Sequence, residues 1–172
     1  PYAPDEDWHS SRQVVKMINQ VSMGSGNLLL NIGPEPDGSV PPLAYERLEP
    51  VGKWLKTYGE AAYGQVDALT RRGLPWMPMG SWSRKGKTAY YWVQRWPGSE
   101  IRIGNLLTKV KKVTLLATGE EVPFEQTEKY IMIKGLPEKN PDELVGISII
   151  KLDCEEPLRG HNEANRRWVQ EP

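Results

Sequence analysis

The 172-residue sequence has few of the residues that build disulfide frameworks and metal sites. Its one cysteine, Cys154, excludes a disulfide framework and a metal site made of several cysteines. The two histidines, His9 and His161, have no partner at metal-ligand spacing. We therefore expect no metal, no cofactor and no catalytic histidine, and we expect Cys154 to be an ordinary thiol.

The sequence also lacks a charge excess, because 22 Lys and Arg residues balance 22 Asp and Glu residues. Nucleic-acid-binding domains normally carry a basic excess, so we expect no nucleic-acid partner. No apolar run approaches the roughly 20 residues that cross a membrane as a helix, so we expect no membrane span. The hydrophobic fraction of 38% and the charged fraction of 26% are typical of a globular protein. Nothing in the sequence indicates an oligomeric state.

Two segments of residues 1–64 are predicted to be helices. The first covers Ser11–Met23, where apolar residues recur at i, i+4 and i+7 after a capping-box pattern: Val14, Ile18 and Val21, with Ser10 and Gln13. The second covers Pro42–Tyr58, which opens at the Pro41-Pro42 pair and ends before Gly59.

Between these helices, the continuous apolar run Asn27–Ile32 predicts a strand that is buried on both faces, as in a parallel sheet. Such a strand needs neighbouring strands, and residues 1–64 contain no other. The chain also begins at Pro1 without a signal peptide. We therefore expect residues 1–64 to be the last helix–strand–helix unit of a larger α/β domain in a longer protein.

Residues 65–155 have a different pattern, with short stretches of period two separated by glycine and proline. They predict a small antiparallel β-sandwich with candidate strands at Thr88–Trp96, Glu100–Ile103, Val110–Ala117, Glu121–Glu125, Tyr130–Lys134 and Gly146–Leu152. Residues 156–172 are mostly polar and are expected to be a tail or a linker. The predicted fold class is thus α/β followed by all-β.

A long ordered string of motifs then makes the sequence specific. Its pieces are Asn-Leu-Leu-Leu-Asn-Ile-Gly-Pro at 27–34, Asp-Gly at 37–38, Glu-Arg-Leu at 46–48, Val-Gly-Lys-Trp-Leu at 51–55, Tyr-Gly-Glu-Ala at 58–61 and Tyr63. In content and spacing, this string resembles the α-L-fucosidases of glycoside hydrolase family 29. Downstream, Lys85-Gly86 and the strand from Tyr90 to Trp96 resemble the start of the family's C-terminal β-sandwich.

The resemblance implies that residues 1–64 end a (β/α)8-like catalytic barrel, with Asn27–Ile32 as its last strand. It implies retaining hydrolysis of terminal α-L-fucosides, with a fucosylated glycan as substrate and a pair of carboxylates as nucleophile and acid/base. In the family, the nucleophilic Asp and usually the acid/base Glu precede the part that corresponds to Pro1. We therefore expect no catalytic residue in this stretch, and no activity from it alone. The family resemblance suggests a secreted, periplasmic or lysosomal location.

Three residues are candidates for contact with the substrate or for support of the site. Asn31 is polar within an apolar strand, at the strand end where barrel enzymes place their chemistry. Glu35 and Asp37 follow in the loop at the same end. For each residue a structural interpretation is also open: a buried amide bonded to the loop backbone for Asn31, a solvated loop for Glu35, and a simple Asp-Gly turn for Asp37.

The tryptophans of the β-rich part allow an alternative function. Exposed rings would make the sandwich a non-catalytic carbohydrate-binding module, and buried rings would make it a structural module. Trp92 and Trp96 are an even number of residues apart, so they are expected to share the core face of one strand. Trp76 and Trp82 are expected to pack between barrel and sandwich.

Overall fold

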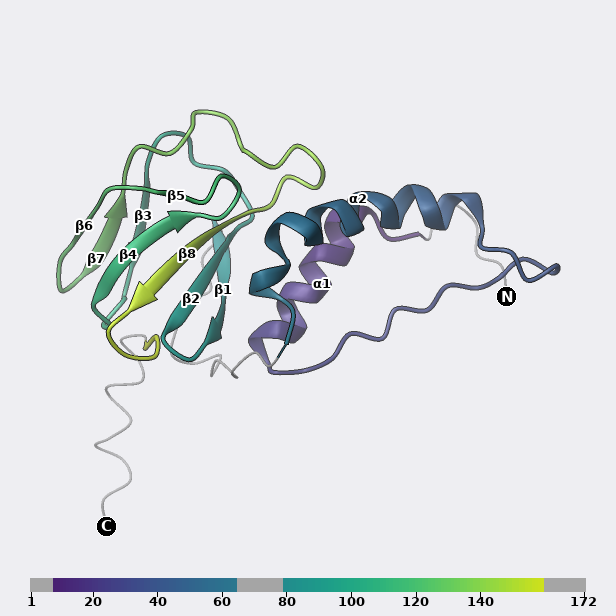
Figure 1. Cartoon of the computed structure of the whole chain (residues 1–172), viewed down its shortest axis with the longest axis horizontal. Coiled ribbons are helices and arrows are strands. Elements are labelled where there is room, and N and C mark those ends of the chain that lie inside the picture. The colour runs from purple at the N-terminus through teal and green to yellow at the C-terminus, as the bar shows by residue number, and fades with distance from the viewer. Residues whose placement is uncertain (1–7, 65–78, 160–172) are drawn as a thin grey trace, which may run out of the picture.

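The computed structural model of the chain describes residues 8–64 and 79–159 (Figure 1). Two helices lie against one face of a two-sheet β-sandwich. Residues 24–41, which we call the arm, contain Asn27–Ile32 and lead from the first helix to the second. The two antiparallel sheets and the two helices agree with the predicted sandwich and helix positions.

The two helices have the predicted bounds, α1 at Ser11–Met23 and α2 at Pro42–Tyr58, and the 3₁₀ turn η2 follows at Gly59–Ala61. The predicted capping box is present. The backbone amide of Gln13 donates to the Ser10 hydroxyl at 3.2 Å, and the backbone amide of Ser10 donates to the side-chain oxygen Oε1 of Gln13 at 2.7 Å. These bonds satisfy amides that the first turn of a helix leaves unpaired, which fixes where α1 begins.

The sandwich has one sheet of five strands and one of three, all antiparallel. The five-stranded sheet has the order β1 (Gly80–Lys85), β2 (Thr88–Val93), β8 (Ser148–Cys154), β4 (Val110–Leu115), β5 (Glu120–Glu121). The three-stranded sheet has the order β3 (Ile101–Gly104), β7 (Tyr130–Ile133), β6 (Phe124–Gln126). Alternate residues of both sheets point inward and form a closed apolar core, which includes Val113, Ile131, Ile133 and Leu152.

The predicted strand Asn27–Ile32 is not a strand in this structure. Leu29 is 90% exposed, and Leu30 and Ile32 are also exposed. Figure 1 shows this segment running away from the sandwich before the chain returns to α2. The physical reason is the one that the sequence implied, because no strand among residues 8–64 lies beside it to pair with its backbone groups.

The strand predictions differ from the structure in two further places. The predicted strand Glu121–Glu125 is split into β5 and β6, which lie in different sheets, with Pro123 between them. Proline has no amide to donate to a ladder, so the chain changes sheet there. Strand β1 was not predicted, because its sequence Gly-Ser-Trp-Ser-Arg-Lys does not alternate in hydrophobicity, although its first four residues are buried.

Residues 156–159 differ from the expected polar tail. Leu158 is buried in the sandwich core, and its carbonyl accepts a hydrogen bond from Arg84 at 3.0 Å. Thr108 bonds the same segment, because its hydroxyl donates to the Pro157 carbonyl at 3.2 Å and accepts from the Arg159 amide at 2.8 Å. The chain therefore stays attached to the sandwich as far as residue 159.

The tryptophans occupy different sides of the sandwich from those predicted. Trp82 lies in the sandwich core against Tyr91, with ring centroids 4.7 Å apart. Trp92 points to the opposite face, against Trp54 of α2 at 5.3 Å. Trp96 lies beyond the end of β2, so the even spacing does not put it on the face of Trp92; it packs against the sandwich core instead. Trp76 lies outside the described residues.

Candidate functional site

The three predicted site residues lie on the arm between α1 and α2. Asn31 is exposed, Glu35 is half-buried and Asp37 is exposed. A tight turn joins the last two, because the Gly38 amide donates to the Glu35 carbonyl at 2.9 Å and the Ser39 amide donates to Asp37 Oδ1 at 2.9 Å. Hydrogen bonds from Ser39 lower the pKa of the Asp37 carboxyl, so it is ionised at neutral pH.

The structure brings Glu35 and Asp37 into one turn but does not bring Asn31 to them. Among residues 8–64 and 79–159, no hydrogen bond or ion pair joins the three side chains. The expected buried amide at Asn31 is absent, because its side chain lies in solvent on an unpaired segment. The arm alone is therefore an incomplete site.

The helices meet the sandwich over the outer face of the five-stranded sheet. This helix–sandwich joint is apolar, with Val14, Val15, Val51, Trp54 and Tyr58 on the helices and Tyr90, Trp92, Val145, Ile147 and Ile149 on the sandwich. The indole of Trp54 is fully buried there and donates to the Ile147 carbonyl at 2.6 Å. A buried aromatic contact with a satisfied donor is a strong anchor between two layers.

Arg12 fastens the first turn of α1 to the same face. Its guanidinium donates to the carbonyls of Val145 and Gly146, each at 2.8 Å, and to the Gln94 carbonyl. Gly146 has φ +71°, which favours glycine, and a Cβ there would lie 2.7 Å from Arg12 Nη1 and displace that side chain.

The loop that carries these carbonyls is held by Asp142. This buried carboxylate accepts from the amides of Leu144 and Val145, each at 3.2 Å, and of Ile147 at 2.9 Å. Its bonds fix the loop in the shape that meets α1.

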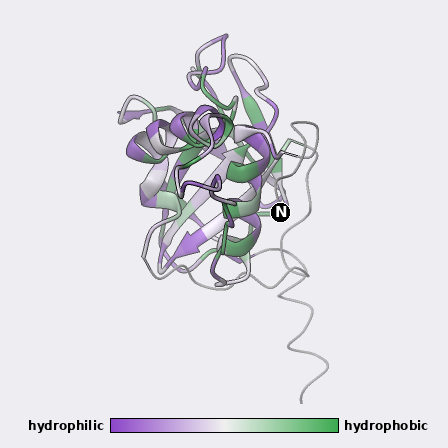
Figure 2. Cartoon of the chain, turned by 90° about the vertical axis from the view of Figure 1, so that its right-hand side faces the viewer, coloured by the Kyte–Doolittle hydropathy of each residue, from purple (hydrophilic) through white to green (hydrophobic). Residues whose placement is uncertain are grey.

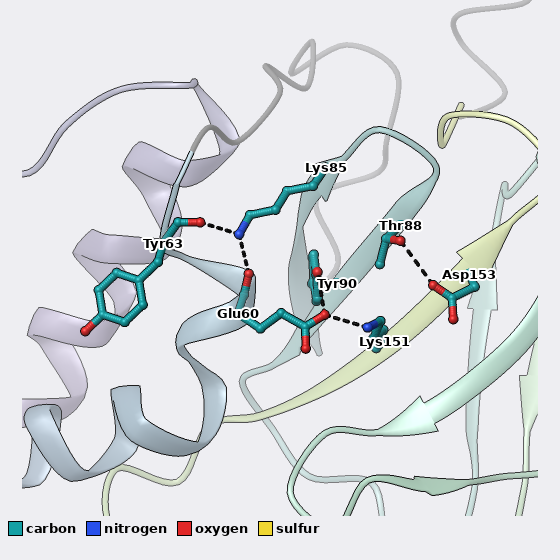
Figure 3. Close-up of polar contacts among 7 residues, drawn as sticks. All are labelled: Glu60, Tyr63, Lys85, Thr88, Tyr90, Lys151 and Asp153. Carbon is teal, nitrogen blue, oxygen red and sulfur yellow. Dashed lines mark hydrogen bonds and ion pairs between the residues drawn. The ribbon is translucent and has the colours of Figure 1, made fainter.

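A polar cluster closes the joint at the end of η2 (Figure 3). We call Glu60, Lys85, Tyr90 and Lys151 the polar clamp. Glu60 Oε1 accepts from the Tyr90 hydroxyl at 2.8 Å and from Lys151 Nζ at 2.5 Å. Lys85 Nζ donates to the backbone carbonyls of Glu60 and Tyr63. The clamp therefore joins η2 to β1, β2 and β8.

The electrostatics of the polar clamp indicate a structural role rather than acid–base catalysis. Burial opposes ionisation of Glu60, but hydrogen bonds from Lys151 and Tyr90 and the charges of Lys151 and Lys85 outweigh it and lower the pKa of this carboxyl. Burial, with the bond to Glu60, raises the pKa of Tyr90. Glu60 is ionised and its Oε1 already accepts two hydrogen bonds, while Tyr90 keeps its proton. Neither group is therefore a good proton carrier at neutral pH.

An open groove of about 540 Å³ lies between α1, α2 and the start of the arm. Its walls include Ile18, Val21, Leu28, Leu55, Ala62 and Tyr63. Figure 2 faces this side of the molecule and shows hydrophobic turns on the helices. Its lining also includes the polar residues Ser22, Ser25 and Asn27, so apolar and polar groups are mixed there.

Other reactive groups in the described part are inert or dispersed. Burial raises the pKa of the Cys154 thiol to about 11, which agrees with an ordinary thiol. Residues 8–64 and 79–159 contain no cluster of three potential metal ligands. None of the helices in these two ranges has the length and hydropathy of a membrane span.

Sequence reasoning missed the polar clamp and the Arg12 contacts. The segment Tyr58–Ala61 was singled out for its motif, but its sequence contains no sign of a partner. The signal lies in strand register, because Tyr90 pairs with Lys151 across β2 and β8 and so presents both donors to one carboxylate. That register links residues about 60 positions apart and cannot be derived from local patterns.

Comparisons of the sequence and of the structure with known proteins find the same family. The sequence model of the α-L-fucosidase family matches residues 1–60. Tissue α-L-fucosidase of Mus musculus is 33% identical over 136 residues, which cover 74% of this chain and 28% of that protein. The tissue enzyme of Homo sapiens is 29% identical over 140 residues, with 76% and 28% covered.

Solved structures of α-L-fucosidases resemble this chain over both the helices and the sandwich. α-L-Fucosidase isoenzyme 1 of Paenibacillus thiaminolyticus superimposes with a TM-score of 0.77 at 27% identity, covering 90% of this chain and 37% of that one. The α-fucosidase of Thermotoga maritima gives 0.72 at 29% identity, covering 88% and 36%. The chain thus spans just over a quarter of the length of the two tissue enzymes and just over a third of the two solved structures. It belongs to the α-L-fucosidase family, glycoside hydrolase family 29, and covers its C-terminal part.

Proposed function

We propose that this chain is part of a retaining glycoside hydrolase that removes terminal α-L-fucose from glycoconjugates. The observation that carries the proposal is that helices and sandwich together superimpose on a fucosidase over 90% of the chain. The relatives that match in sequence are named α-L-fucosidases, and the Thermotoga maritima enzyme has been solved in complex with fucose. A fucosylated glycan is the corresponding substrate.

In this proposal, residues 1–64 supply the last strand and helices of a (β/α)8-like barrel, and residues 65–155 form the sandwich behind it. The exposed apolar side chains of Leu29, Leu30 and Ile32 support a place beside further strands. Leu28 and Leu55 line the open groove between the helices, and their place there supports the same arrangement. The nucleophilic Asp and the acid/base Glu come from the part of the protein that precedes Pro1, so this stretch alone is inactive.

Asn31, Glu35 and Asp37 are then proposed to lie at the catalytic end of the barrel. Active sites of such barrels lie at the carboxyl ends of their strands. Asn31 is near the end of the proposed last strand, and Glu35 and Asp37 follow that end. The ionised Asp37 and the half-buried Glu35 offer acceptors for sugar hydroxyls, and the Asn31 amide offers both a donor and an acceptor.

The test is hydrolysis of 4-nitrophenyl α-L-fucopyranoside by this chain and by the protein from the longer reading frame. We expect nitrophenol release from the longer protein only, with the α-anomer of fucose appearing first by NMR. The matching β-D-galactopyranoside is the control and should be a poor substrate. Turnover by the chain alone would contradict the proposed division of roles, and a longer protein without α-L-fucosidase activity would contradict the proposed function.

The alternative is a non-catalytic module, and one observation favours its structural form over its carbohydrate-binding form. Trp54, Trp82 and Trp92 are buried, and the described residues have no tryptophan among their exposed large side chains. A sugar-stacking platform needs an exposed aromatic face. The sandwich instead uses its outer face to hold the helices, so we propose structural support of the barrel as its role. Titration of the chain with fucosylated glycans should leave its tryptophan fluorescence unchanged.

A further inference from the structure

We propose that the ionised carboxylate of Glu60 ties the helices to the sandwich, so that its protonation in acid loosens α2 and η2 while the sandwich stays folded. This inference concerns the helix–sandwich joint and is independent of the proposed reaction. It rests on the geometry of the polar clamp.

Glu60 is placed to act between two layers of the fold. It lies on η2, directly after α2, and its two side-chain donors lie on the neighbouring strands β2 and β8. Tyr90 and Lys151 are paired across these strands, so both donors reach one oxygen without rearrangement. The side chain of Glu60 is 45% exposed, so protons from solvent reach it easily.

The charged groups around Glu60 favour its ionised form. Lys85 faces it from β1 and Lys151 from β8, while Tyr90 from β2 donates a hydrogen bond. Asp153, whose charge acts on Tyr90, accepts from the Thr88 hydroxyl at 3.1 Å (Figure 3). Protonation of Glu60 would leave the two lysines without the anion that lies between them.

The direction of the pH effect follows from the pKa of Glu60, which is lowered in the folded chain. A carboxyl with a lowered folded pKa stabilises the fold above its ordinary value of 4.5 and loses that contribution as the pH falls through the folded value. The effect is therefore expected below about pH 4.5 and absent at neutral pH.

The remaining ties explain why the helices loosen and the sandwich does not unfold. Trp54 and Arg12 hold the helices through bonds to neutral backbone carbonyls, which do not depend on Glu60. The sandwich core is closed by its own two sheets. Asp142 accepts from backbone amides of its own loop, so a variant at Glu60 leaves those bonds in place.

The experiment is hydrogen exchange of the 172-residue chain, followed by mass spectrometry and corrected for intrinsic rates, at about pH 7 and about pH 3. In the unmodified chain, the opening constant of peptides from α2 and η2 should rise roughly fivefold in acid, with β8 unchanged. Glu60→Gln should raise that constant at neutral pH and show less than a twofold change in acid. Glu49→Gln is the matched control, because Glu49 pairs with Lys53 at 2.8 Å on the exposed face of α2.

Three results would overturn the proposal: no acid effect on α2 in the unmodified chain, an undiminished acid effect in Glu60→Gln, or equal loss of protection in β8. If Glu60→Gln does not fold, Lys151→Met removes the same ion pair from the strand side. It should show less than half of the acid response, and a full response would overturn the proposal.

Discussion

The sandwich and the helical region differ in how they bury their apolar surface. The sandwich closes its core between its own two sheets, and Val113, Ile131, Ile133 and Leu152 are fully buried in it. The helical region buries one face against the outer surface of the sandwich and leaves Leu29 and the groove beside Leu55 open to solvent. The sandwich therefore supplies its own core, whereas the helical region depends on neighbours.

The largest expected effect comes from breaking the dependence of the helices on the sandwich. Trp54→Ala removes a fully buried indole and leaves the Ile147 carbonyl without its donor, which should cost about 3–5 kcal/mol. Urea unfolding followed by circular dichroism at the helical band measures it. Tyr45→Ala, on the exposed side of the same helix, should cost less than about 0.5 kcal/mol. Equal costs for the two variants would contradict the asymmetry of α2.

Gly146→Ala tests the second tie between the regions. It adds a Cβ at positive φ and displaces Arg12, so we expect a loss of about 2–3 kcal/mol in the free energy of unfolding. Gly119→Ala has similar backbone strain, at φ +74°, but its Cβ meets nothing within 4 Å, so it should lose only about 1–2 kcal/mol. The difference between the variants measures the Arg12 contact, and no difference would show that the contact contributes nothing.

Ser10→Ala sharpens the comparison within the helical region. It removes the side-chain acceptor of the capping box and should cost about 1 kcal/mol, measured by the same urea unfolding. Ser10→Asn restores an acceptor at the same place and should recover most of the loss. A full loss in both variants would indicate that Ser10 acts by a contact other than the cap.

The smallest expected effect is at Leu29, an apolar residue of the helical region that is exposed, unlike the apolar core residues of the sandwich. Leu29→Ser in this chain should change the free energy of unfolding by less than about 0.5 kcal/mol, because the side chain is 90% exposed. In the longer protein the same change should cost about 2 kcal/mol or more, since the proposed barrel buries this residue. An equally small cost there would contradict the proposed barrel strand.

Much of the fold could be predicted from local sequence. The bounds of α1 and α2 follow from caps, glycine stops and apolar spacing, all of which act within a few residues. Most strands follow from period-two patterns, although Pro123 divides one of them and β1 has no such pattern. The site could be predicted only as an arm with Asn31, Glu35 and Asp37, and the structure joins two of these in a turn.

The sequence by itself determined the two helices, the β-rich region and the membership of a family, because each depends on neighbouring residues or on an ordered string of motifs. Only the tertiary structure decided that Trp82 faces the sandwich core and Trp92 the helices, and that Glu60 meets Lys151. Trp54 and Ile147 are 93 residues apart in the chain, and Glu60 and Lys151 are 91 apart. Such contacts depend on strand register and on how the layers stack, and both are set by the packing of the whole chain.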